Sequence, residues 1–399
     1  MRQCQLCNSE RLQKIIDLGM HPLADHFLSK SELADQEKRF PLFVVLCEDC
    51  GHAMLGNWVS PEDRYQSHEY SYTASNSKAS LAHFSELADV VGEYVHIKSG
   101  DLVIDIGSND GTLLDFFREK FETDVLGVDP SPNIIKLAQE RGVPTRLDFF
   151  TAKVGKEIGN HKKATAITST NTFNHISDMD DFMGGIDAAL SPTGVFVFEV
   201  PYFLDLIDQT AFDTIYLEHI SYFSVKPFVR FFAQRGFHIQ KLERTPYMGG
   251  SIRVFVGRSI PEEDPTRDFI NKEESARVFD PSSYRALMEK INEFKVSLLN
   301  EIRNIKDGGG KIAGVGAATK GNTLLNYCAI TNEMLEFVTD GSPLKIGKYT
   351  PGAHLPIVGD DELNDPTITH ALILPWNIAD LLVKKLARPG LSFIIPRVH

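Results

Sequence analysis

The sequence predicts an α/β protein in three parts, in which a small cysteine-bearing module precedes two Rossmann-like domains. Three observations support this prediction. Two C-x2-C pairs lie within the first 50 residues, short apolar segments alternate with amphipathic ones between residues 102 and 256, and a second glycine-rich loop follows an apolar segment near residue 315. A chain of 399 residues has room for two to four domains.

Acidic residues outnumber basic ones. The chain has 54 Asp and Glu against 41 Lys and Arg, a formal net charge of −13, which argues against a nucleic acid or an anionic membrane as a partner. No apolar run approaches the ~20 residues of a membrane-spanning helix, and the first residues, MRQC, lack the apolar core of a signal peptide. We therefore expect a cytoplasmic protein without membrane or nucleic-acid partners, either a monomer or a weak dimer.

Four of the five cysteines form the two C-x2-C pairs. Each pair can present two thiolates on one turn, and four thiolates fill the shell of a tetrahedral Zn²⁺ ion, so the metal would be structural. The alternative is two disulfides or unligated thiols, although disulfides are rare in the cytoplasm. The predicted ligands of a zinc-binding module over residues 1–66 are Cys4, Cys7, Cys47 and Cys50, and the fifth cysteine, Cys328, is expected to be a buried structural thiol.

The next part of the chain has the pattern of a doubly wound, mostly parallel sheet. One apolar segment of the module, Phe40–Cys47, already predicts a buried strand. Apolar residues at helical spacing then predict a helix over residues 76–97, and alternating strands and helices follow in a domain over residues 67–260. The expected strands of this domain are Leu102–Ile106, Val125–Val128, Ala164–Thr168, Val195–Val200 and Ile252–Val256.

A glycine-containing loop follows the first of these strands, in the sequence VIDIGSNDG. It lacks both the G-x-G-x-x-G pattern and the lysine of a phosphate loop, which disfavours NAD and ATP, and it resembles motif I of class I S-adenosylmethionine methyltransferases. After the next strand, VLGVD ends in a carboxylate suited to two ribose hydroxyls, although such an aspartate can also be a structural cap. The candidate cofactor-binding residues are Asp105, Gly107, Ser108, Asn109, Gly111, Asp129, Asn171 and, for the adenine, Asp148 and Phe149.

Titratable side chains gather in two later segments, NTFNH and IYLEHISYFS. Histidine moves protons near neutral pH, and an adjacent acid can raise its basicity or fix its orientation. The candidate catalytic residues are His175, Tyr216, Glu218, His219 and Tyr222. The segment EYSYTASNS adds Tyr72 as a catalytic candidate and Tyr70 as a substrate contact, unless these tyrosines only pack at a domain interface.

A helical connector over residues 261–305, with a long helix over Ser282–Ile305, leads to the third domain over residues 306–399. The sequence GVGAATKGNTLLN contains three glycines, Gly314, Gly316 and Gly321, at the start of a predicted helix. This loop could bind the phosphate of a ligand, or it could serve only to close a structural turn. The candidate substrate-binding residues are Lys320 and Asn322 in this loop and Arg253 in the earlier segment GGSIR.

The order of these segments resembles the three-domain sugar C-methyltransferases over nearly the whole chain. After the first cysteine pair, the segments that carry the resemblance are HPLADHFL, EYSYTASNS, IDIGSNDG, NTFNHI, YLEHISYFS, YMGGSIR and GVGAATKGNTLLNY. The resemblance implies a zinc-binding domain, an S-adenosylmethionine domain and a C-terminal Rossmann-like domain around one active site. It further implies a nucleotide-linked, dTDP-type 4-keto-deoxysugar as substrate, with His219 as the base, Tyr216 and Glu218 beside it, His175 at the reacting centre and one tyrosine, Tyr70 or Tyr72.

The proposed chemistry suits the residues themselves. A base removes a proton from the carbon beside a ketone, and the enolate attacks the methyl group of S-adenosylmethionine while a donor stabilises the carbonyl oxygen. We therefore predict C-methylation, at C-3 beside a C-4 ketone, without catalysis at zinc. The alternatives are an O- or N-methyltransferase for another small molecule and a catalytically silent protein that binds S-adenosylmethionine.

Overall fold

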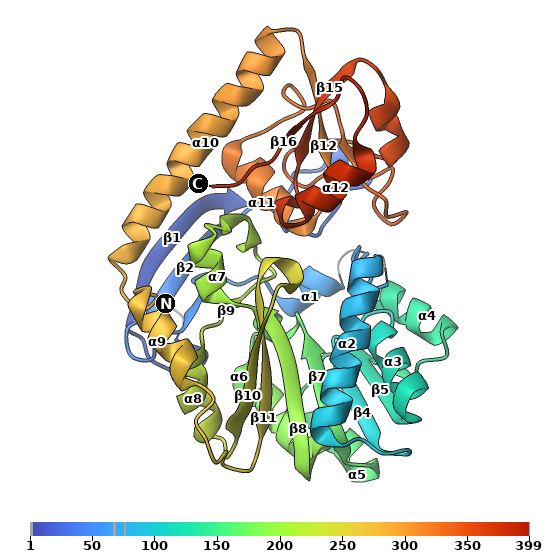
Figure 1. Ribbon diagram of the computed structural model, residues 1–399, viewed down its shortest axis with the longest axis vertical. Helices are drawn as coiled ribbons and strands as arrows, with labels where there is room; N and C mark the ends of the chain where they lie inside the picture. The colour runs from blue at the N-terminus through green and yellow to red at the C-terminus, as the bar shows by residue number, and fades with distance from the viewer. Residues whose placement is uncertain (1–2, 67–68, 76, 399) are drawn as a thin grey trace.

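The computed structural model describes residues 3–66, 69–75 and 77–398, whose strands form three sheets (Figure 1). The strands of the N-terminal, antiparallel sheet are, in spatial order, β1 (Leu12–His21), β2 (Phe40–Cys47), β3 (Ala53–Leu55) and β9 (Ser221–Tyr222). Strand β2 confirms the strand predicted over the same residues. Because β9 comes from the second domain, the sheet of the N-terminal module reaches beyond residue 66.

The second domain is built on a seven-stranded sheet in the order β10-β11-β8-β7-β4-β5-β6. Its strands are β4 (Leu102–Ile106), β5 (Asp124–Asp129), β6 (Thr145–Leu147), β7 (Ala164–Thr170), β8 (Leu190–Pro201), β10 (His238–Thr245) and β11 (Ser251–Gly257). Strands β4 to β8 are parallel, whereas β11 pairs antiparallel with β8 and β10. The five predicted strands are confirmed, and the carboxyl ends of β4, β5 and β7 meet at the edge where such sheets bind ligands.

Helices cover both faces of this sheet, which explains why its central strands are mainly apolar and buried. Helices α2 and α3 share one core with Val103, and helices α5, α6 and α8 share the opposite core with Ile104, the next residue of β4. The predicted helix over residues 76–97 corresponds to α2, whose first turn is capped by the Ser77 hydroxyl. The helices of the domain are α2 (Lys78–Val95), α3 (Thr112–Phe121), α4 (Pro132–Glu140), α5 (Ala152–His161), α6 (Met179–Ala189), α7 (Phe203–Asp208) and α8 (Val225–Ala233).

The third domain contains a five-stranded parallel sheet in the order β14-β13-β12-β15-β16. With β12 counted as the first strand, this is the order 3-2-1-4-5 of a Rossmann-like fold, which confirms the prediction. The elements of this domain are β12 (Lys311–Val315), α11 (Thr319–Cys328), β13 (Val338–Thr339), β14 (Ile357–Val358), β15 (Ile368–Ile373), α12 (Ala379–Leu386) and β16 (Ser392–Ile394).

Two helices, α9 (Arg267–Ser275) and α10 (Ser283–Asp307), connect the second domain to the third. Helix α10 runs along the outside of the molecule from one domain to the other and contacts β1, and it confirms the long helix predicted over Ser282–Ile305 (Figure 1). Among the described residues, no helix is both long and apolar enough to cross a bilayer. Five short helices carry residues of the candidate site or of its surroundings. They are α1 (Pro61–Tyr65), η2 (Phe173–His175), η3 (Phe212–Thr214), η4 (Tyr247–Gly249) and η6 (Trp376–Ile378).

Candidate active site

The four predicted zinc ligands lie together. Their Sγ atoms are all within 4.8 Å of one another, and the Cys4–Cys50 and Cys7–Cys47 Sγ–Sγ distances are both 3.6 Å. Four thiolates ~2.3 Å from Zn²⁺ form a tetrahedron with edges of about 3.8 Å, so this cluster fits a zinc ion and leaves no open coordination position. The fifth cysteine, Cys328, is buried in α11, as predicted.

The turn that carries the first cysteine pair also contacts the two histidine-bearing loops of the second domain, the one with His175 and the one with His219. Gln5, which lies between the two cysteines, donates its side-chain amide to the carbonyl oxygens of Ile176 at 2.9 Å and Ser177 at 3.0 Å. Its Oε1 atom accepts a hydrogen bond from the Ser221 hydroxyl at 2.7 Å. The zinc module is therefore attached to the residues directly after His175 and His219. Nothing in the sequence pattern had pointed to Gln5.

Two carboxylates mark the ends of β4 and β5, where the cofactor was expected. Asp129 accepts backbone hydrogen bonds from Asn109 at 3.0 Å and Ser131 at 2.9 Å, which hold its carboxylate at the edge of the sheet. Asp105 accepts a hydrogen bond from the Thr168 hydroxyl at 2.7 Å, and burial raises its pKa to about 7. Burial also raises the pKa of Asp129.

The loop between them takes a backbone path that requires glycine. Gly107 and Gly111 have φ angles of +71° and +77°, and a Cβ atom on Gly107 would lie 2.1 Å from the Thr172 hydroxyl oxygen. Two nearby polar atoms, the Ser108 hydroxyl oxygen and the Asn171 amide oxygen, are buried without a partner among the described residues. Unpaired buried atoms of this kind can bind the polar groups of a ligand, so the pocket fits S-adenosylmethionine.

The segment over residues 69–75 covers this loop through Asn109. The Asn109 side chain accepts a hydrogen bond from the Ala74 amide at 2.8 Å and donates one to the Tyr72 carbonyl oxygen at 3.0 Å. Of the two residues expected at the adenine, Phe149 is half-buried. Asp148 instead accepts two hydrogen bonds from the Arg146 guanidinium, at 3.1 and 2.8 Å, so its carboxylate is not presented alone to a ligand.

His219 is held as a neutral imidazole with a defined tautomer. Its Nδ1 atom lies 2.9 Å from the Thr214 carbonyl oxygen, which can only accept, so Nδ1 carries the proton and Nε2 has a free electron pair. The Tyr216 hydroxyl lies 2.5 Å from Nε2 and donates to it. Burial lowers the pKa of His219 to about 3, which keeps the ring unprotonated near neutral pH.

His175 faces His219 across the same site. The two ring centroids are 4.9 Å apart with the ring planes at 69°, and the Tyr65 hydroxyl hydrogen-bonds to His175 Nδ1. Burial, together with the neighbouring His219 and Arg64, holds the pKa of His175 well below its ordinary value. Both histidines are therefore neutral.

Arg64 on α1 joins the two histidine-bearing loops. It is 1% exposed, and its guanidinium donates to the carbonyl oxygens of His175 at 3.1 Å and Glu218 at 3.2 Å and to the Ser177 hydroxyl at 3.0 Å. Neither Arg64 nor its neighbour Tyr65 was predicted from the sequence. An arginine in a short polar helix gives no sequence signal of burial.

Glu218 does not orient His219, contrary to the expectation for an adjacent acid. Its Oε1 atom accepts a hydrogen bond from the Asp25 amide at 2.9 Å, and its Oε2 atom is buried without a partner among the described residues. Burial, with the nearby Asp25 carboxylate, raises the pKa of Glu218 to about 7. The Thr214 carbonyl oxygen orients the imidazole instead.

The two N-terminal tyrosines occupy different places. The ring centroid of Tyr70 lies 5.8 Å from that of Tyr65, beside His175, whereas the Tyr72 hydroxyl lies 3.4 Å from the Tyr247 hydroxyl in η4. Tyr70 is therefore the tyrosine next to Tyr65, the phenol that hydrogen-bonds to His175. Burial raises the pKa values of Tyr70, Tyr216 and Tyr222 well above the ordinary value, so these phenols remain donors at neutral pH.

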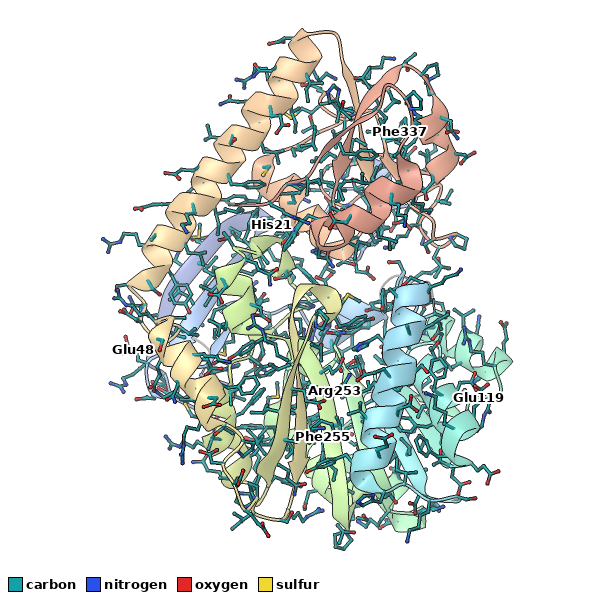
Figure 2. The ribbon with its side chains drawn as sticks, in the orientation of Figure 1. His21, Glu48, Glu119, Arg253, Phe255 and Phe337 are labelled. Carbon is teal, nitrogen blue, oxygen red and sulfur yellow. The ribbon has the colours of Figure 1, made fainter. Side chains whose placement is uncertain are left out.

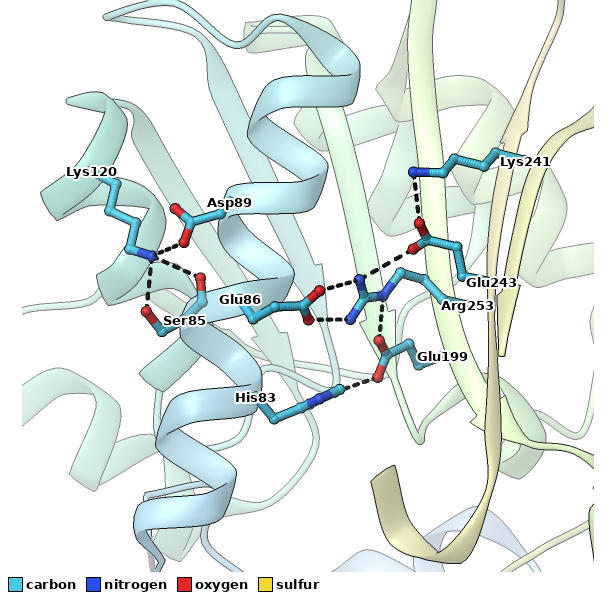
Figure 3. A network of polar contacts seen from close by, with 9 residues as sticks. All are labelled: His83, Ser85, Glu86, Asp89, Lys120, Glu199, Lys241, Glu243 and Arg253. Carbon is cyan, nitrogen blue, oxygen red and sulfur yellow. Dashed lines mark hydrogen bonds and ion pairs between the residues drawn. The ribbon is translucent and has the colours of Figure 1, made fainter. Parts of the chain in front are cut away.

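Arg253 was predicted to contact the substrate, but it is buried among glutamate side chains. It is 2% exposed and pairs with Glu199 at 2.5 Å, Glu86 at 2.6 Å and Glu243 at 3.3 Å (Figure 3). In β11 it lies on the same face as Phe255, which belongs to the core under α2 (Figure 2). A phosphate next to three carboxylates would be repelled, so these surroundings do not support a phosphate contact.

The glycine loop of the third domain packs against the N-terminal module. Asn322 donates its side-chain amide to the Ala24 carbonyl oxygen at 2.6 Å, and the Thr319 hydroxyl donates to the Asp25 carboxylate at 2.8 Å. These contacts favour loop closure, the second of the two interpretations of this loop, over phosphate binding. Lys320 points another way, with its ammonium 4.4 Å from the centre of the Trp376 ring and 3.8 Å from Asp213.

A cavity of about 800 Å³ lies between the second and third domains, next to Trp376 and Asp213. It is large enough for a small-molecule ligand. One wall is η3, whose last residue, Thr214, holds the His219 imidazole. The side chains that line the cavity include Phe212, Asp213, Arg244, Thr245, Leu324, Trp376, Asn377 and Arg397.

Similarity to known proteins identifies the family. C-methyltransferase NovU of Streptomyces niveus is 31% identical over 401 residues, which cover 99% of this chain and 95% of NovU. The chain belongs to this C-methyltransferase family. Three family models match it in succession, a zinc binding domain over residues 4–65, a methyltransferase domain over residues 80–242 and a C-methyltransferase C-terminal domain over residues 246–396. The protein is thus an S-adenosylmethionine-dependent methyltransferase with an N-terminal zinc site.

Two solved methyltransferase structures are each similar to less than half of this chain. The plantazolicin methyltransferase BpumL, in complex with S-adenosylhomocysteine, is 12% identical, with 47% of this chain and 88% of that chain covered at a TM-score of 0.37. The magnesium protoporphyrin IX methyltransferase of Synechocystis is 16% identical, with 45% and 85% of the two chains covered at a TM-score of 0.37.

Proposed function

We propose that the protein methylates a nucleotide-linked 4-keto-deoxysugar at C-3, with His219 as the base. The observation that carries this proposal is the His219 imidazole, which is buried and neutral, with Nδ1 engaged by Thr214 and the electron pair of Nε2 directed at a phenol. An unprotonated nitrogen of fixed orientation can accept a proton from carbon. General-base catalysis is most efficient when the pKa of the base lies near the working pH, so the bound substrate has to raise the pKa of His219. NovU supports the C-methylation, and the sugar nucleotide is our own inference.

In this mechanism, the Tyr216 hydroxyl turns away from His219 Nε2, which takes the proton from the carbon beside the ketone. The electron pair of the broken C–H bond forms the enolate. S-Adenosylmethionine, when bound, supplies an electrophilic methyl group and leaves as S-adenosylhomocysteine. Asp129 would bind its ribose from the end of β5. Tyr70 and the Tyr65–His175 pair lie where a donor could stabilise the enolate oxygen.

We place the nucleotide end of the substrate in the cavity between the second and third domains. Trp376 offers an aromatic surface there, and Arg397 offers a cationic side chain. Lys320, predicted as a substrate contact, lies against the same tryptophan and beside Asp213. Thr319 and Asn322 of the glycine loop instead bind the N-terminal module and are not part of this proposed site.

His219→Asn tests the base. The asparagine amide cannot accept a proton as imidazole does, so turnover should fall by about 10²–10⁴-fold, while the Kd for S-adenosylmethionine stays within about twofold. His161→Asn, at the exposed end of α5, is the matched control. An unchanged rate in His219→Asn at saturating substrate would exclude this residue as the base.

The product identifies the substrate class. The wild-type enzyme is incubated with dTDP-, GDP- and CDP-linked 4-keto-deoxysugars and methyl-¹³C-labelled S-adenosylmethionine. We expect one labelled methyl group on C-3, located by its carbon–carbon coupling in the NMR spectrum. A methyl group on oxygen or nitrogen would overturn the enolate mechanism.

A further inference from the structure

Asp25, in the N-terminal module, is hydrogen-bonded to three other parts of the chain. It is 3% exposed. Its carboxylate accepts hydrogen bonds from the hydroxyls of Ser71 at 2.9 Å and Thr319 at 2.8 Å, and its backbone amide donates to Glu218 at 2.9 Å. These contacts reach the segment over the cofactor loop, the third domain and the loop that carries His219.

The contact to the third domain lies at the first residue of α11. The amino end of a helix carries partial positive charge and unpaired amides, and it is the part of a glycine loop where a phosphate would bind. The carboxylate of Asp25 lies at this end, and Asn322 in the next turn binds the adjacent Ala24 carbonyl oxygen. The N-terminal module thus supplies its own anion to the glycine loop.

The contact to Ser71 holds the segment over residues 69–75, which lies between the cofactor loop and Tyr65. Ser71 lies between Tyr70, whose ring is next to that of Tyr65, and Tyr72, whose carbonyl oxygen is bound by Asn109. One carboxylate therefore determines how this segment lies relative to the third domain. The contact to Glu218 adds the residue directly before His219.

We propose that Asp25 is a positioning residue that couples docking of the third domain to the placement of the segment over residues 69–75 and of the His219 loop. The inference rests on the methyltransferase activity and needs no particular substrate. The charged or titratable groups that face Glu218 are Asp25, Arg64, Tyr65, Tyr216 and Tyr222. Asp25 contributes a carboxylate to this set. It acts on the reaction through Glu218, the residue before His219, and through the segment over residues 69–75.

Hydrogen exchange of the full-length, zinc-loaded protein tests the coupling. Thr319→Val removes the donor of the third domain and should speed amide exchange of residues 317–326 about fivefold or more. Ser71→Ala removes the other donor and should speed exchange of residues 69–75. Because Asp25 couples the two contacts, each of these two variants should also speed exchange in the segment of the other. Asp25→Asn should speed both segments, whereas Asp17→Asn, at an exposed carboxylate of β1, should change neither. Wild-type exchange at both segments in Asp25→Asn would overturn the proposal.

Kinetics separate positioning from general stability. Thr319→Val lies outside the cofactor pocket, so the Kd for S-adenosylmethionine should stay within about twofold while kcat falls about three- to tenfold, the effect of one hydrogen bond. Asp25→Asn should also move the pH dependence of kcat to lower pH, because loss of a neighbouring negative charge lowers the pKa of Glu218. Wild-type kcat and pH dependence in both variants would refute the coupling. If no sugar nucleotide is turned over, the exchange pattern alone decides the question.

Discussion

Glu218 lies directly before His219 in the chain, yet the two side chains have different partners. The imidazole is oriented by a carbonyl oxygen of η3, whereas the carboxyl group reaches the amide of Asp25. Burial leaves this carboxyl group with a pKa of about 7. Near neutral pH it can therefore be a proton donor as well as an anion.

Glu218→Gln should change how stability depends on pH. The folded protein retains the Glu218 proton up to a pKa of about 7, whereas the unfolded chain loses it near 4.5, so this group's contribution to stability is lost as pH rises between these values. Glutamine has no such proton, and the variant should gain stability relative to the wild type by up to about 3 kcal/mol between pH 4 and pH 8. Unfolding free energies measured at both pH values check this, and a pH-independent difference would contradict it.

Asp129→Ala addresses the cofactor instead of the base. Its carboxylate is fixed by the amides of Asn109 and Ser131 and keeps acceptor capacity for two hydroxyl groups. Loss of these hydrogen bonds should weaken S-adenosylmethionine binding by about 10- to 100-fold. Asp124→Ala, at the exposed start of β5, is the control. Calorimetry that gives the same Kd for both variants would remove Asp129 from the site.

At the scale of elements, an ionic network joins α2 to the sheet. Arg253 on β11 contacts Glu86 on α2, Glu199 on β8 and Glu243 on β10 (Figure 3). His83 on α2 pairs with the same Glu199 at 2.6 Å and stacks on Tyr247, 3.7 Å between ring centroids. The network thus connects the core under α2 to η4, where Tyr247 lies next to Tyr72 of the segment over residues 69–75.

Arg253→Met should destabilise the fold strongly. The variant leaves Glu199, which is 1% exposed, as a buried carboxylate without its guanidinium, and such losses cost about 3–5 kcal/mol. Arg277→Met, whose side chain is 63% exposed, should cost less than about 1 kcal/mol. Chemical unfolding curves of the two variants make the comparison, and similar midpoints would show that the network contributes little.

At the scale of the whole molecule, the zinc module contacts both loops that carry the candidate histidines, His175 and His219. Strand β9, which follows His219, is the fourth strand of the module's sheet and pairs with β3. Gln5, between two zinc ligands, binds the backbone after His175 and the hydroxyl of Ser221. The metal thus holds a turn to which both histidine-bearing loops are attached.

Removal of zinc should therefore abolish turnover although no zinc ligand faces the reaction. Cys7→Ser should lose zinc and activity together, and Cys328→Ala should retain both. Gln5→Ala is the sharper variant, because it should keep a full complement of zinc, measured by atomic absorption, while turnover falls about tenfold or more. Full turnover in Gln5→Ala would show that the module does not act through this residue.

The site could be predicted only in part. Short spacing predicts the two cysteine pairs, whose four thiols lie together in the structure. Strand ends predict the two aspartates, which lie at the carboxyl ends of β4 and β5. The two histidines, predicted from their segments, lie next to each other. Arg253 could not be placed, because its glutamate partners come from three other elements. Asp25, Arg64 and Gln5 were missed for the same reason, since their partners lie far away in the sequence.

From the sequence alone follow the three-part α/β architecture, the zinc ligands and the methyltransferase pocket, because these depend on residue types within short segments. Tertiary structure decided that Tyr70 rather than Tyr72 lies next to Tyr65, that Thr214 rather than Glu218 orients His219, and that the glycine loop of the third domain binds the N-terminal module. Each of these depends on which distant group fills a buried hydrogen bond, and only the packed chain determines that.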